Sequence, residues 1–110
     1  TAAKWAMIGL TKTWAMEMGP DGVRVNAICP GSVSGPHIDG VIERDALSRE
    51  QTPDAIKKVY ARQSSMRVFV DPEDIAAMAV FLSSKESRYV SGQAIAVDGH
   101  TEGLSNWLED

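Results

Sequence analysis

Two short apolar segments, each closed by a sharp turn, limit the fold more than any other feature of the sequence. Residues 23–29 read VRVNAIC and end at a Pro-Gly pair, and residues 94–97 read AIAV and end at an Asp-Gly pair. Apolar runs of this length, bounded by Gly and Pro, are typical of β-strands. We therefore predict two strands, at residues 23–29 and 94–97.

Helical patterns alternate with these strands. Residues 2–18 are good helix formers without a proline, and the breakers GPDG follow them. Asp71 is an N-cap acceptor before Pro72, a combination that starts a helix predicted to run to about Ser84. The order helix, strand, helix, strand indicates a parallel α/β sheet. Two strands alone would leave open edges, so the pattern demands more strands than this sequence provides.

The two long helices are expected to bury apolar side chains. Residues 2–18 are apolar nearly all round, which predicts burial on more than one side, with one face against another subunit. The later helix has helically spaced apolar residues that should face a core, namely Ile75, Met78, Ala79, Phe81 and Leu82. A mostly polar tail containing Trp107 and Leu108 follows the second strand.

A loop-like stretch and two short helical patterns lie between the first strand and the second long helix. Residues 32–40 are rich in Gly, Ser and Pro and predict a loop, and two short helical patterns follow at residues 38–49 and 53–63. Helical flaps of this kind often cover a ligand. We therefore predict that residues 36–65 form a helical substrate lid.

Composition excludes several classes of function. The net charge of −4 and the pI near 5.1 predict no nucleic-acid partner, since no basic stripe is present. No apolar stretch approaches the ~20 residues that cross a bilayer, so we expect no membrane association. The single cysteine, Cys29, predicts a buried thiol in a cytoplasmic protein, and the two histidines lack metal-ligand spacing, so no metal site is assigned.

Four sequence blocks, in this order, resemble the C-terminal half of the short-chain dehydrogenase/reductase family. They are TAAK with the helix after it, GVRVNAICPGSV, RVFVDPEDIAAMAVFLSS and YVSGQAIAVDGH, which together cover about two thirds of the 110 residues. The resemblance implies one domain over residues 1–110, the C-terminal portion of a Rossmann-like doubly wound parallel sheet. It also implies that the chain begins one residue after the family's catalytic tyrosine.

Lys4 is the catalytic residue that this resemblance assigns. It aligns with the lysine of the family's Tyr-x-x-x-Lys motif, in which residues four apart share one helix face. A neighbouring ammonium favours the phenolate of a tyrosine whose free pKa is about 10. In the family the same lysine binds the nicotinamide ribose hydroxyls. From its position alone, Lys4 would be taken for a solvated lysine near a helix start, and the other three blocks decide against that interpretation.

The resemblance also assigns cofactor contacts after the first strand, at the sheet edge where ligands of open α/β folds bind. Pro30, Gly31 and Val33 would line the nicotinamide, with the Val33 backbone bonding the carboxamide. The family often has a threonine two residues after the valine, where this chain has Gly35. The hydroxyl of Ser34, or backbone amides around Gly35, would contact the cofactor phosphates instead.

The implied activity is hydride transfer between NAD or NADP and a carbonyl or secondary alcohol, by a homodimer or homotetramer. The isolated segment would be inert. A small alcohol or sugar is the first substrate class, and 3-oxoacyl-carrier-protein reduction is the alternative within the family. A non-catalytic oligomerisation module remains open if the protein has only these 110 residues.

Three further residues have structural interpretations. Arg24 and Asn26 belong to the family pattern, and we expect both to bond backbone groups or an interface. His100 stands where the family has a glycine. His37 is expected to be a solvated loop residue.

Overall fold

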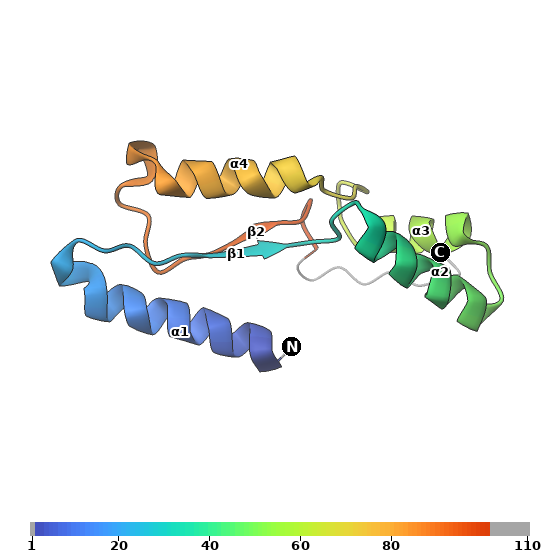
Figure 1. Ribbon diagram of the computed structural model, residues 1–110, viewed down its shortest axis with the longest axis horizontal. Helices are drawn as coiled ribbons and strands as arrows, with labels where there is room; N and C mark the ends of the chain where they lie inside the picture. Colours follow the sequence, from blue (N-terminus) through green and yellow to red (C-terminus); the bar gives the residue numbers. More distant parts are fainter. Residues whose placement is uncertain (1, 102–110) are drawn as a thin grey trace.

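The computed structural model describes residues 2–101, arranged as two strands, four α-helices and two short 3₁₀ turns (Figure 1). In chain order the elements are α1 (Ala2–Met18), a turn at Gly19–Asp21, β1 (Ala27–Pro30), α2 (Pro36–Arg49), α3 (Pro53–Arg62), α4 (Pro72–Ser83), a turn at Lys85–Ser87 and β2 (Ala94–Val97). The polar tail with Trp107 and Leu108 lies outside the described residues.

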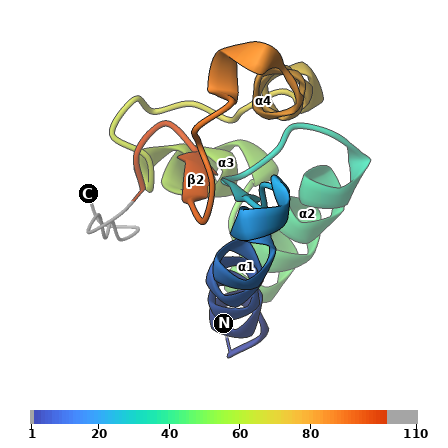
Figure 2. The same cartoon turned by 90° about the vertical axis from the view of Figure 1, so that its left-hand side faces the viewer.

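The strands form a parallel pair with helices on both sides. Their register runs from Ala27 opposite Ala94 to Pro30 opposite Val97. In Figures 1 and 2, α4 lies on one side of the pair and α1 on the other, and α4 packs against both strands. The predicted α/β architecture is confirmed by this layering, which is that of a doubly wound sheet.

Three predicted boundaries move. The first strand starts at residue 27 instead of 23, because Val25 bonds a turn and not a neighbouring strand: its N–H donates to Ser91 Oγ (3.1 Å) and its carbonyl accepts from Gly92 N–H (2.7 Å). The loop predicted at residues 32–40 is shorter, because Pro36 occupies the first helical position of α2. The helix predicted at residues 53–63 ends one residue earlier, at Arg62.

Arg24 and Asn26 fasten the start of this strand to the chain after α4. The Arg24 guanidinium donates to the carbonyls of Leu82 (2.7 Å), Ser87 (3.0 Å) and Val90 (3.2 Å). Asn26 donates to the Val90 carbonyl (2.8 Å) and accepts from the Gln93 N–H (3.1 Å). The expected backbone-bonding role of both side chains is confirmed: together they bond the Leu82 carbonyl at the end of α4 and backbone groups of the chain that follows it.

The apolar helices are less covered than expected. On α1 only Thr11 is buried, while large apolar side chains are exposed by 37–74%: Trp5, Met7, Leu10, Trp14, Met16 and Met18. On α4, Ile75, Met78 and Leu82 are half-buried, but Phe81 is 44% exposed. Residues 2–101 cover only part of α1, so its burial on more than one side, with one face against another subunit, stays a prediction. No helix among residues 2–101 is long and apolar enough to span a bilayer.

Replacing Arg24 with alanine should destabilise the complete protein by about 2–4 kcal/mol, because several hydrogen bonds to a charged group are lost and half-buried carbonyls are left unpaired. Chemical denaturation measures the change. Arg88→Ala is the control, since Arg88 is exposed and lies over the ring of Tyr89, which is 90% exposed. Equal losses of stability in the two variants would contradict the stabilising role of the Arg24 hydrogen bonds.

Candidate functional site

A pocket of about 200 Å³ joins the start of α1 to β1. It is lined by Lys4, Met7, Ile8 and the strand residues Ala27, Ile28, Cys29 and Pro30. Two of the predicted site residues, Lys4 and Pro30, therefore share one pocket although they are far apart in the sequence. Lys4 is exposed, and among residues 2–101 its ammonium has no hydrogen bond or ion pair. It is free to bind a ligand.

The predicted burial of the Cys29 thiol is wrong. The thiol is half-buried and lines the same pocket, whereas full burial was expected. The strand is too short, and too thinly covered by α1, to enclose it.

The loop after β1 is held by a single parallel bridge between Val33 and Val70. The Ser34 N–H donates to the Val70 carbonyl (2.8 Å), and the Val70 N–H donates to the Ser32 carbonyl (3.0 Å). In such a bridge the neighbours of Val33 take the bonds, so its own N–H and C=O face the other way. Within the described chain they make no hydrogen bond. One free donor and one free acceptor complement a primary carboxamide.

Gly31 is fixed by packing. Its N–H donates to the Val97 carbonyl (3.0 Å), which continues the ladder beyond β1. A Cβ at this position would lie 2.6 Å from Asp98 Cβ and 2.9 Å from Asp98 Cα, closer than non-bonded carbons approach. The glycine is therefore required for the two chain segments to meet, whatever it contacts in a ligand.

Gly35 explains the missing threonine. Its backbone has φ 146° and ψ −178°, a conformation that glycine adopts and side-chain-bearing residues avoid. A threonine would not fit this backbone, and the chain turns here directly into α2. Ser34 is half-buried, and its hydroxyl makes no hydrogen bond among the described residues. His37 is exposed in the first turn of α2, so its predicted solvation is confirmed but its predicted loop is not.

The end of β2 meets the chain just after α3, at the far end of the predicted lid. Burial raises the pKa of Asp98, but hydrogen bonds from Thr101 and the His100 N–H, together with the His100 charge, outweigh it and lower that pKa. His100 has a positive φ of 71°, and its Nδ1 lies 3.0 Å from Ser65 Oγ. The Ser65 N–H donates to the His100 carbonyl (2.8 Å).

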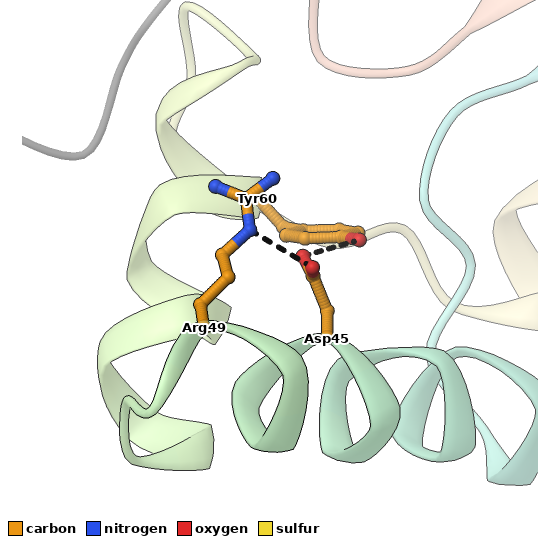
Figure 3. Close-up of polar contacts among 3 residues, drawn as sticks. All are labelled: Asp45, Arg49 and Tyr60. Atoms are coloured by element: carbon orange, nitrogen blue, oxygen red, sulfur yellow. Dashed lines mark hydrogen bonds and ion pairs between the residues drawn. The ribbon is translucent and has the colours of Figure 1, made fainter.

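The two lid helices are joined by a polar contact as well as by apolar packing (Figure 3). Asp45 on α2 accepts from Tyr60 Oη on α3 (3.2 Å) and from Arg49 Nε one turn along α2 (2.9 Å). Burial raises the pKa of Tyr60, the Asp45 carboxylate raises it further, and Arg49 opposes the shift. The neutral phenol therefore remains the donor in this contact.

Phe69 and Val70 also belong to this region, although the sequence analysis did not assign them to it. Phe69 packs against the lid, and Val70 bridges the loop after β1. The run VFV before Asp71 was an available signal of an extended segment. No group of three or more His, Cys, Asp or Glu side chains within residues 2–101 is placed to hold a metal ion.

Comparison with known proteins identifies the family. A family model described as enoyl-(acyl carrier protein) reductase matches residues 1–101. The chain belongs to the short-chain dehydrogenase/reductase family. It is 42% identical over 97 residues to the short-chain reductase protein NovJ of Streptomyces niveus, a match that covers 88% of this chain and 36% of that protein.

Solved structures agree with the fold. A short-chain dehydrogenase family protein from Francisella tularensis superposes with a TM-score of 0.87 at 26% identity, over 94% of this chain and 43% of that one. A 4-hydroxyisoleucine dehydrogenase complexed with NADH superposes with a TM-score of 0.68 at 28% identity, over 94% and 38%. The chain thus spans well under half the length of these relatives, and its fold is the corresponding part of a Rossmann-like sheet.

Gly31→Ala should destabilise the complete protein by about 1–3 kcal/mol, the usual cost of inserting a methyl group into a tight contact. Thermal or urea unfolding measures this. Gly19→Ala is the matched control, because a Cβ there meets nothing within 4 Å and Gly19 is not among the glycines with positive φ, so it should be neutral or stabilising by up to about 1 kcal/mol. A tolerated Gly31→Ala would mean that the contact with Asp98 relaxes freely.

Proposed function

We propose that this chain supplies the C-terminal part of an NAD- or NADP-dependent oxidoreductase that transfers a hydride between the nicotinamide and a carbonyl or secondary alcohol. The observation that supports it most is the meeting of Lys4 with the carboxyl end of β1 in one pocket, beside a loop with an unpaired Val33 peptide. The relative solved with NADH supports the cofactor class.

The loop residues fit a nicotinamide. The Val33 N–H would donate to the carboxamide oxygen and the Val33 C=O would accept from the carboxamide NH₂, and the two bonds would fix which ring face is presented. Pro30 and Gly31 would lie against the ring, and Ser34 Oγ or the amides at the start of α2 would contact the phosphates. The bound nicotinamide supplies or accepts the hydride at its C4.

Lys4 acts on two groups in this proposal. Its ammonium would donate to the ribose hydroxyls and so orient the nucleotide. It also lowers the pKa of the tyrosine that the family motif places four residues before it, so that the phenol exchanges a proton with the substrate oxygen near neutral pH. The pocket walls of Met7, Ile8 and Ile28 are apolar, so their side chains offer the ammonium no strong competing hydrogen-bond acceptor.

The lid would select the substrate. We propose a small alcohol, a sugar or their carbonyl forms. The description of the matched family model names acyl carrier protein, which favours a carrier-bound 3-oxoacyl chain as the second candidate. Initial rates with a panel of both classes, each with NADH and NADPH, separate the two.

Replacing Lys4 with alanine should lower kcat of the complete enzyme by at least about 100-fold, the usual scale for disabling acid/base catalysis, and should weaken nucleotide binding. Steady-state kinetics and nucleotide titration measure the two effects. Lys85→Ala is the control, because Lys85 is exposed in the turn after α4, away from the pocket. A Lys4 variant with near-normal turnover would remove the catalytic assignment.

We also propose that the complete protein is a homodimer or homotetramer in which another subunit covers α1. Trp5 and Met16, exposed by 70% and 74%, lie eleven residues apart and so share a helix face within about 20°. Contiguous apolar surface of this kind marks an interface.

Trp5→Glu should therefore lower the molar mass that light scattering gives at micromolar concentration, by converting oligomer to smaller species. Leu47→Glu on α2, where the leucine is 81% exposed, should leave the mass unchanged. A monomeric wild type would contradict the assembly directly.

A further inference from the structure

The lid hairpin of α2 and α3 is a small structural unit of its own. Its core is formed by Ile42, Ala46 and Ile56, which are at most 4% exposed. The contact between Asp45 and Tyr60 ties the two helices together at their polar side (Figure 3). Neither helix packs extensively against the strands, α1 or α4, and Figure 1 shows the hairpin beyond the carboxyl end of β1. Something other than broad packing must set its orientation.

The covalent link at the front of the lid is a poor device for that purpose. The chain passes from the loop after β1 into α2 through Gly35, whose φ of 146° is open to glycine alone. Glycine has more accessible conformations than any other residue, so a single glycine link restricts direction weakly.

Phe69 reaches the lid core from outside the hairpin. It packs against the buried cluster together with Ile38 of α2 and Tyr60 of α3, and it is the member of this set that belongs to neither helix. Lys57 Nζ of α3 lies 5.7 Å from the centre of its ring, within the range of a cation–π contact. The aromatic ring is thus held by both helices.

The next residue is fixed to the loop that would hold the nicotinamide. Val70 is 8% exposed and forms the bridge to Val33 through two backbone hydrogen bonds. Consecutive residues of an extended segment project to opposite sides. One dipeptide, Phe69-Val70, therefore connects the lid core to the candidate cofactor loop.

We propose that Phe69 is a positioning residue, which sets the substrate lid relative to the nicotinamide loop and couples the two. This inference rests on the proposed function. Nucleotide binding that orders the Val33 loop would hold Val70, and through Phe69 it would hold the hairpin in the orientation that receives substrate. Coupling of this kind is reciprocal, so substrate under the lid would also tighten nucleotide binding.

The first test compares three variants of the complete enzyme. Phe69→Ala should raise KM for the carbonyl or alcohol substrate about tenfold, as expected if nine lids in ten lose the competent orientation, while changing the Kd of nucleotide alone by less than about twofold. Phe69→Leu keeps an apolar side chain in the lid core, so its KM for substrate should return most of the way to the unaltered value. Phe81→Ala on α4 is the matched truncation, since that ring is 44% exposed and lies outside the lid cluster.

Equal losses in Phe69→Ala and Phe81→Ala would overturn the proposal, as would a fall in kcat with KM unchanged. If Phe69→Ala does not fold, Phe69→Leu carries the test, and it should raise substrate KM measurably more than Phe81→Ala does.

The second test uses the unaltered enzyme. Addition of NADH or NADPH without substrate should slow hydrogen exchange of amides in residues 36–62 at least about threefold, with β2 as the internal control. If nucleotide binds but hydrogen exchange in residues 36–62 does not change, the proposed coupling is overturned. If neither nucleotide binds, the proposed function fails instead, and the positioning role is judged by whether Phe69→Leu speeds exchange in residues 36–62 relative to β2.

Discussion

The parallel ladder between β1 and β2 is the constraint from which the candidate site follows. Pairing of Pro30 with Val97 places the next residues, Gly31 and Asp98, in contact too close for any side chain on the first. Because parallel strands end at the same edge, the loop after β1 and the turn after β2 start together. Every residue assigned to the nicotinamide, apart from Lys4 and the strand residue Pro30, lies on the loop that this pairing directs.

The two strands are too small to cover the apolar faces of the helices beside them. α1 and α4 keep large apolar side chains exposed, Trp5 and Val80 by 70% each, while the pocket beside Lys4 opens between α1 and a single strand. Exposed apolar surface on this scale costs about 25 cal/mol for each Å² that is left uncovered. Apolar surface of this kind is expected where further elements pack against it, and the relatives are more than twice as long as this chain.

Much of this fold could be predicted from sequence because its signals are local. Proline at a first helical position gave the starts of α3 and α4, and the AIAV run gave β2 with both ends correct. The start of β1 could not be predicted, since the strand-like run begins at Val23, whereas Val25 and Asn26 bond a turn more than 60 positions away. The packing of Phe69 against the lid core also could not be predicted, because it depends on distant parts of the chain. A single aromatic residue in the sequence does not indicate which core it enters.

The strained residues of the described chain lie between the helices of the predicted lid and behind them. Side-chain-bearing residues with positive φ occur, within residues 2–101, at Glu50 between the lid helices, at Arg67 behind them and at His100 where β2 meets them. Such conformations cost about 1 kcal/mol or more and persist where surrounding bonds compensate. Arg67 has those bonds in the carbonyls of Arg62 (2.7 Å) and Ser64 (3.0 Å), and His100 has Ser65 and Asp98. A lid fastened this firmly at its rear and joined by one glycine at its front has its freedom at the front, beside Val33, where a bound nicotinamide would restrict it.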